Sequence, residues 1–190
     1  MASQIRIIGG QWKRSVLPVP AHQGLRPTPD RVRETLFNWL GQSLPGWRCL
    51  DLFAGTGALG LEAASRGAAS VLLVECDPGV VRHLQNSVRR LKADAVVQVV
   101  RADARIWLDR TPPAPQDLVF LDPPFRVGWL ARILPAVMPW LAPGGVIYVE
   151  ADIELTPGWL AEHGLTDIGI IRAGRAGQVH YHLLSRNSVD

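Results

Sequence analysis

The chain has few cysteines, and this shortage excludes two kinds of small-protein scaffold. Among its 190 residues only Cys49 and Cys76 are cysteines. Both fall in apolar, strand-like runs, where a small buried thiol is the usual interpretation, so we expect both to be buried and reduced. A structural zinc site normally needs four Cys or His ligands, and no such cluster stands out in the sequence. We therefore predict neither a disulfide framework nor a metal site.

Long apolar runs and low-complexity tracts are also missing. No apolar stretch approaches the roughly 20 residues that a membrane-spanning helix needs, and the N-terminal Met-Ala-Ser-Gln-Ile-Arg lacks the apolar core of a signal peptide. These absences favour a cytoplasmic protein. A hydrophobic content of 47% in 190 residues suits one globular unit with a short extension. We divide the chain into an N-terminal extension, residues 1–46, and a main domain, residues 47–190, and expect a monomer.

Acidic residues are scarce near the N-terminus. The whole chain has a net charge of +3, but up to Arg48 seven basic residues stand against two acids, a net of +5. A basic end on a near-neutral body predicts a polyanionic partner, although a run of charge is more often only a solvated face. Trp12 lies beside Lys13 and Arg14, where its ring can stack on a nucleotide.

The N-terminal extension should contain a hairpin and a helix. Two β-prone runs lie around Gly9-Gly10, which predicts a pair of short strands. Thr28, Pro29 and Asp30 form a helix-start signal: a hydroxyl at the N-cap, a proline at the first helical position and an acid near the positive end of the helix dipole. The apolar residues that follow recur at helical spacing, so this helix should pack against a core.

From Trp47 onward, short apolar runs alternate with helical stretches. This pattern predicts a parallel sheet covered on both faces. The expected strands are residues 49–53, 70–74, 96–100, 118–121 and 146–149. The expected helices are 59–65, 80–91, 104–109 and 129–141, the last disturbed by Pro135 and Pro139. Residues 165–171 and 178–184 have no helix between them, which predicts an antiparallel hairpin at one end of the sheet.

A glycine motif follows the first strong strand and opens a helix. It reads Asp51-Leu-Phe-Ala-Gly-Thr-Gly-Ala-Leu-Gly60, and glycines in that position let the backbone approach a cofactor. The same spacing suits a dinucleotide, as in a dehydrogenase, whose pyrophosphate needs free amides at the helix N-terminus. Here Asp51 ends the strand and favours a cationic ligand instead. The motif therefore predicts binding of S-adenosylmethionine through Asp51, Phe53, Gly55 and Gly57.

Two further acids follow the next strands. Glu75 comes about twenty residues after the glycines, where an acid accepts hydrogen bonds from ribose hydroxyls. Asp103 can accept from the adenine amino group, with the backbone at Ala104 fixing the ring. For Asp103, a cap on the following helix is nearly as good an interpretation.

The motif Asp122-Pro-Pro-Phe125 follows the fourth strand. Its two prolines fix φ and remove amide donors, which leaves carbonyls in a stiff loop. The Asp122 carboxylate and the Pro123 carbonyl can hold both hydrogens of a base amine and aim its lone pair at a methyl group. Phe125 can stack on the base, so catalysis would be mostly positioning. Alone, Asp-Pro-Pro is also a common turn.

The sequence resembles the RsmD family of bacterial 16S rRNA (guanine-N2)-methyltransferases. Beyond the two motifs above, the resemblance lies in Arg6-Ile-Ile-Gly-Gly-Gln-Trp12, Leu25-Arg-Pro-Thr28 and Arg31-Val-Arg-Glu-Thr-Leu-Phe-Asn-Trp39, and it extends to Gly177-Gln-Val179. The glycine and Asp-Pro-Pro-Phe motifs are common to many amino-methyltransferases, whereas the N-terminal signature is far more specific.

The resemblance implies a class I, Rossmann-like methyltransferase with a seven-stranded sheet and an N-terminal hairpin that grips RNA. Its implied substrate is 16S rRNA in the 30S subunit or an assembly intermediate. The residues we assign to RNA contacts are Arg6, Trp12, Lys13, Arg14, Arg26, Arg31 and Arg33. Two alternatives remain open: an adenine-N6 methyltransferase acting on DNA or RNA, and a nonenzymatic ribosome-assembly factor that keeps the fold.

Overall fold

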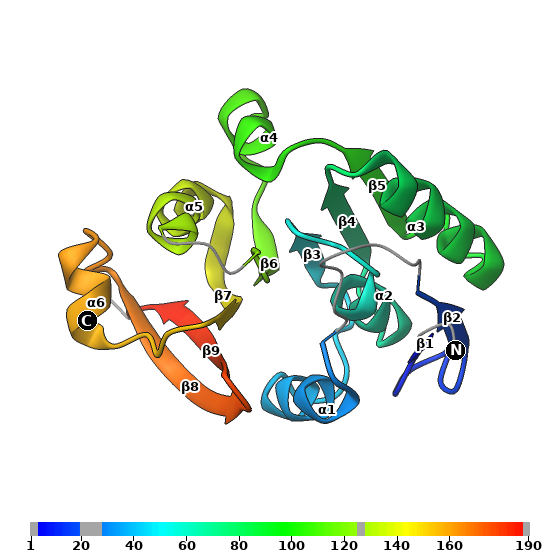
Figure 1. Cartoon of the computed structure of the whole chain (residues 1–190), viewed down its shortest axis with the longest axis horizontal. Coiled ribbons are helices and arrows are strands. Elements are labelled where there is room, and N and C mark those ends of the chain that lie inside the picture. The colour runs from blue at the N-terminus through cyan, green and yellow to red at the C-terminus, as the bar shows by residue number, and fades with distance from the viewer. Residues whose placement is uncertain (1–3, 20–27, 125–127, 188–190) are drawn as a thin grey trace.

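The fold is built on one seven-stranded sheet. Figure 1 shows the computed structural model, which describes residues 4–19, 28–124 and 128–187. The strand order is β5-β4-β3-β6-β7-β9-β8. The strands are β3 (Arg48–Asp51), β4 (Ser70–Glu75), β5 (Val97–Arg101), β6 (Gln116–Leu121), β7 (Leu141–Ala151), β8 (Ile168–Ala176) and β9 (Val179–Arg186).

The direction of the strands confirms the predicted sheet. From β5 to β7 all neighbours pair in parallel, and β9 pairs antiparallel with both β7 and β8. The C-terminal pair is therefore the expected hairpin at one end of the sheet. The order reverses direction between β3 and β6, and in such sheets ligands bind beyond the carboxyl ends of the strands at that point.

Helices cover both faces of the sheet (Figure 1). On one face α1, α2 and α3 share a core with the strand residues Cys49 and Leu118, and on the other α4, α5 and α6 pack with Leu50 and Val119. Alternate strand residues point to opposite faces, which is why neighbours in sequence enter different cores. The helices are α1 (Asp30–Trp39), α2 (Ala58–Ser65), α3 (Pro78–Leu91), α4 (Ala104–Arg110), α5 (Trp129–Val137) and α6 (Pro157–Glu162). No helix in the described part of the chain is long and apolar enough to cross a membrane.

Several sequence-based details need correction. Thr28 does not cap α1, because Pro29 is the N-cap and the Thr28 hydroxyl donates to Glu150 instead. The short helix α6 was not predicted, although Thr156 caps it by accepting from the Trp159 amide. Cys49 is buried as expected, but the prediction that Cys76 is buried is wrong: it lies just past the end of β4 and is exposed.

The N-terminal hairpin lies against the end of α2. Its strands, β1 (Gln4–Arg6) and β2 (Val16–Pro18), pair antiparallel as predicted. The amides of Gln11 and Trp12 donate to the carbonyl and hydroxyl oxygens of Ser65 at 2.8 and 3.0 Å. Gly10 has φ +73°, and a Cβ there would lie 1.8 Å from the Ser65 carbonyl oxygen, so a side chain would push the hairpin off the helix.

A buried ion-pair network ties the hairpin and α1 to α2. Glu62 is fully buried and accepts from the amides of Ile8 and Gly9, each at 2.8 Å. The same carboxylate pairs with Arg33 at 3.3 Å and with Arg66 at 2.7 Å. Both oxygens of the Glu62 carboxylate therefore accept hydrogen bonds, which is the condition under which a buried carboxylate is tolerated.

Candidate active site

Three acids meet at one edge of the sheet. Asp51 ends β3, Glu75 ends β4 and Asp122 follows β6 by one residue. The three strands are parallel neighbours, with β3 between the other two. Their carboxyl ends therefore lie side by side, which brings the glycine motif and the Asp-Pro-Pro motif to the same edge of the sheet.

The glycine loop is held in shape by the acid of the neighbouring strand. One Glu75 oxygen accepts from the Gly55 amide at 3.0 Å, and the other accepts from the Asp77 amide at 2.8 Å. Gly57, the N-cap of α2, has φ +79°, and a Cβ there would lie 2.8 Å from the side chains of both Leu61 and Leu84. Glycine is therefore required at this position for both conformation and space.

Asp51 is a buried acid with an unsatisfied oxygen. Its side chain is 1% exposed, and Oδ2 accepts from the Gly60 amide at 3.2 Å. Its Oδ1 is buried and has no hydrogen-bond partner within the described residues. Burial raises the pKa of Asp51 to about 7, and the nearby backbone amides of Gly60 and Phe53 lower it by a smaller amount. A buried carboxylate with one oxygen free to accept is suited to a cationic ligand, such as one that carries sulfonium and ammonium groups.

We predict that pH will affect the stability of the ligand-free protein through Asp51. The pKa of Asp51 is about 7 in the folded protein and near 3.8 in the unfolded chain. The folded protein therefore holds this proton more tightly, and the resulting contribution to the free energy of unfolding is fully present below pH 3.8 and is lost as pH rises through about 7. Relative to Asp51→Asn, wild-type protein should lose on the order of 2 kcal/mol between pH 5 and pH 8. Urea unfolding of both proteins at the two pH values measures this difference. Parallel pH dependence of the two proteins would contradict the assignment.

Asp122 lies in a strongly acidic setting. It is half-buried, Pro123 is buried and Pro124 is exposed. Burial raises the pKa of Asp122 well above its ordinary value, and the charges of Glu150 and Asp51 raise it further. A nearby positive charge would favour its ionised form. Phe125 of the same motif lies outside the described residues.

A ring contact links the glycine motif to the start of α5. The Phe53 ring, in the glycine motif, packs edge-on against the Trp129 ring at the start of α5, with centroids 5.7 Å apart and planes at 88°. Trp129 follows the Asp-Pro-Pro motif closely in sequence, so this contact joins the two loops.

Beyond the end of β5, Asp103 has the helix-capping role that the sequence analysis left open. Its Oδ1 accepts from the Ile106 amide at 3.0 Å and so caps α4, whose first residue is the buried Ala104. Asp103 itself is exposed, and Ile106 beside it is an exposed hydrophobic residue.

The structure divides the predicted RNA contacts. Arg6, Lys13, Arg14 and Arg31 are exposed. Arg33 is fully buried, with its guanidinium bonded to Glu62, Asp30 and the Arg6 and Thr28 carbonyls, so the prediction that it contacts RNA is wrong.

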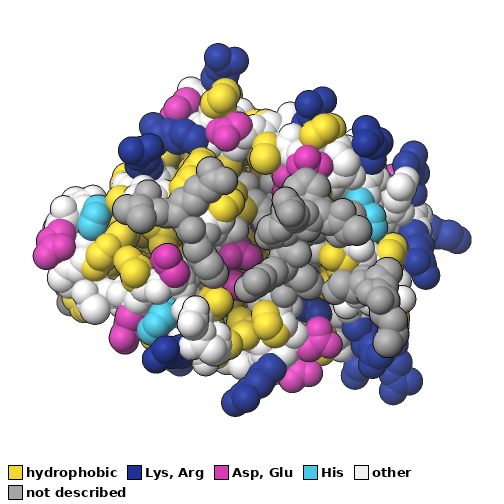
Figure 2. Space-filling view, in the orientation of Figure 1, with side chains coloured by type: hydrophobic (Ala, Val, Ile, Leu, Met, Phe, Trp, Pro, Cys, Tyr) yellow, Lys and Arg dark blue, Asp and Glu magenta, His cyan; other side chains and the backbone are white. Residues whose placement is uncertain are grey.

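The remaining two predicted contacts have different outcomes. Trp12 is half-buried against the core, which leaves only part of its ring for a ligand. Arg26 lies outside the described residues. In Figure 2, Lys and Arg side chains are most numerous on the right side of the face shown, and acidic side chains lie at its centre as well as at several places on its rim.

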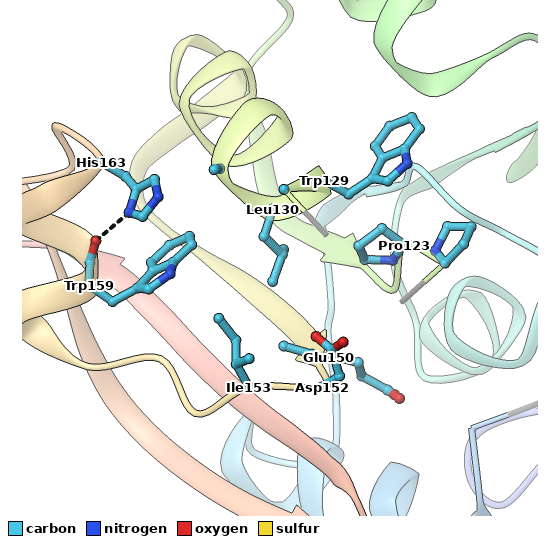
Figure 3. A pocket seen from close by; sticks show the side chains of 12 residues that line it. Pro123, Trp129, Leu130, Glu150, Asp152, Ile153, Trp159 and His163 are labelled. Carbon is cyan, nitrogen blue, oxygen red and sulfur yellow. Dashed lines mark hydrogen bonds between the residues drawn. The ribbon is translucent and has the colours of Figure 1, made fainter. Parts of the chain in front are cut away.

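Sequence reasoning missed a pocket beside Pro123. It has a volume of about 360 Å³ and lies between the Asp-Pro-Pro loop, α5, the end of β7 and α6 (Figure 3). Its acids are Glu150 and Asp152, and its aromatic side chains are Trp129, Trp159 and His163. Glu150 lies at the carboxyl end of the run 146–149, as Glu75 and Asp122 lie at the ends of theirs, and this signal could have identified it.

The strand order and the site together define a class I S-adenosylmethionine-dependent methyltransferase. The chain belongs to the family described as Conserved hypothetical protein 95, whose model matches residues 5–185 and which is the RsmD family named above. No dinucleotide-dependent dehydrogenase activity is needed to explain the glycine motif.

Curated relatives and solved structures agree with this membership. The chain is 45% identical to "Ribosomal RNA small subunit methyltransferase D" of Escherichia coli, over 98% of this chain and 92% of the relative. It is 33% identical to "Putative rRNA methyltransferase YlbH" of Bacillus subtilis, over 88% and 98%. A putative methyltransferase structure from Escherichia coli matches with a TM-score of 0.84 at 46% identity, covering 98% of this chain and 99% of that one.

Proposed function

We propose that this enzyme transfers a methyl group from S-adenosylmethionine to the N2 amine of a guanine in 16S rRNA, presented in the 30S subunit or an assembly intermediate. The observation that carries the proposal is the single sheet edge on which Asp51, Glu75 and the Asp122-Pro123 corner meet. The relatives' names, which specify small-subunit ribosomal RNA, support the choice of substrate. With that substrate we also propose a cytoplasmic, monomeric enzyme.

The cofactor would lie along the glycine loop. The orphaned Asp51 oxygen suits its cationic end, and Glu75, already bonded to the Gly55 amide, has lone pairs left for ribose hydroxyls. When bound, S-adenosylmethionine supplies an electrophilic methyl group. The residues that we assign to its site are Asp51, Phe53, Gly55, Gly57, Glu75, Asp103 and Ala104.

The chain's own contribution to the reaction is to hold the target amine. The lone pair of a base amine is delocalised into the ring, so the amine is a poor nucleophile until its hydrogens are fixed. The Asp122 carboxylate and the Pro123 carbonyl would accept those two hydrogens, and Phe125 would stack on the base. Because Asp122 has a raised pKa, it is also suited to take the proton that the amine loses.

Nucleoside analysis tests the substrate. The protein is incubated with methyl-labelled S-adenosylmethionine and small subunits that lack the modification, and the rRNA is digested to nucleosides. We expect label in N2-methylguanosine. Label in N6-methyladenosine would instead support the adenine alternative, and no label in any nucleoside would favour a nonenzymatic assembly factor.

We predict that RNA binding through the N-terminal hairpin will depend on salt. Lys13 and Arg14 are exposed on the loop of the hairpin, and each lost phosphate contact lowers the slope of log affinity against log salt by about 0.7 to 0.9. Lys13→Glu with Arg14→Glu should weaken small-subunit binding and flatten that slope. The control is Arg105→Glu, because Arg105 is exposed on α4, where it pairs with Asp109. Equal binding by wild type and the double variant across salt concentrations would exclude this contact.

A further inference from the structure

The pocket beside Pro123 has the size and chemistry of a base-binding site. Its volume of about 360 Å³ is large enough for a purine, and its walls include Leu130, Ile153 and the Trp159 ring, which is stacked on His163 at 4.0 Å. Figure 3 shows the Glu150 carboxylate directed toward the space between Leu130 and Pro123. A base that enters here under the proposed function would bring its edge to an acid next to the proposed amine-holding corner.

Hydrogen bonds fix the orientation of the Glu150 carboxylate. The Thr28 and Tyr148 hydroxyls both donate to its Oε1, each at 2.9 Å. The described residues provide no hydrogen bond to Oε2. Glu150 is only 4% exposed, and although burial raises its pKa, the two hydroxyls favour the ionised form. One oxygen is therefore anchored while the other remains able to accept from a ligand.

The two purines present opposite chemistry to such an oxygen. Beside its N2 amine, guanine has an N1–H donor, whereas adenine has an unprotonated N1 acceptor beside its N6 amine. A carboxylate oxygen accepts from the first and repels the second. A site built around a hydrogen bond rejects analogues that cannot make it far more strongly than an apolar pocket can.

We propose that Glu150 selects guanine by accepting a hydrogen bond from N1–H while Asp122 and Pro123 hold the adjacent amine. Thr28 and Tyr148 are positioning residues that orient the Glu150 carboxylate. The proposal rests on the proposed function and adds to it the residue that distinguishes guanine from adenine. It also gives Thr28, in the N-terminal extension, a part in the active site.

Replacing the target guanine with 2-aminopurine tests this contact. The analogue keeps the 2-amino group but has no proton on N1. Small subunits are rebuilt from ligated rRNA with either base at the position mapped by nucleoside analysis. Wild-type kcat/KM should favour guanine by at least about 100-fold. In Glu150→Gln the amide oxygen can still accept from Thr28 and Tyr148, but the amide now offers N–H groups. This variant should raise the 2-aminopurine to guanine ratio by about 100-fold.

Asp152→Asn removes a charge from the same pocket and is the matched control, for which the ratio should not change. Equal wild-type rates on the two bases would overturn the proposal whether or not the Glu150 variant folds. The proposal would also be overturned if Glu150→Gln lowered both rates by one factor, or if Asp152→Asn shifted the ratio equally. Failure of wild type to methylate guanine N2 at all would instead reject the proposed function.

Discussion

Asp122→Ala is expected to reduce kcat by about 1000-fold or more while cofactor binding is largely kept. The variant loses the carboxylate that would hold the target amine, and loss of one positioned catalytic hydrogen-bonding group commonly costs about 100- to 1000-fold. Removing the acid also deprives the amine of a proton acceptor. Methyl transfer to small subunits under single-turnover conditions measures the first effect, and calorimetric titration with S-adenosylmethionine measures the second.

Thermal unfolding of Asp122→Ala shows whether its lower kcat reflects a loss of folding. Asp122 is repelled by Glu150 and Asp51, so its removal should leave thermal stability unchanged or higher. Asp117→Ala is the matched control, because Asp117 lies on the same strand but at the opposite end, paired with Arg48 at 3.2 Å. Its kcat should match wild type. Undiminished turnover by Asp122→Ala would show that the catalytic assignment is wrong.

The sheet and its acidic edge could be predicted because their signals are local. The apolar runs at 49–53, 70–74 and 118–121 are followed directly by a glycine turn or an acid, and in a parallel sheet all carboxyl ends reach the same edge. Asp51, Glu75 and Asp122 therefore come to the same edge of the sheet. The C-terminal hairpin was predictable for the same reason, since two strands without a helix between them must run antiparallel if they pair directly.

The sequence misled where a side chain's partner lies far along the chain. Thr28 has the pattern of a helix cap, yet its hydroxyl bonds to Glu150, 122 positions away. Arg31 and Arg33 look alike in sequence, but α1 turns the first to solvent and the second toward Glu62. Which arginine is buried depends on the packing of α1 on α2, and no local pattern contains that information.

Glu62→Ala should destabilise the protein by about 3 to 5 kcal/mol. It would leave Arg33 and Arg66, both buried, without their shared carboxylate, and breaking a buried pair typically costs that amount. It would also leave the amides of Ile8 and Gly9 without acceptors. In a chain of this size the loss corresponds to a fall in Tm of about 10 °C, measurable by urea and thermal unfolding.

Asp109→Ala provides the contrast, because it also removes the carboxylate of an arginine pair, 3.0 Å from Arg105, but one that is half exposed. That change should cost less than about 1 kcal/mol. Replacing both Arg33 and Glu62 with Met should be less harmful than losing Glu62 alone, since one buried arginine, Arg66, rather than two is then left without that carboxylate. Equal, small losses for Glu62→Ala and Asp109→Ala would mean that the hairpin and α1 are held to α2 by apolar packing, with the buried carboxylate adding little.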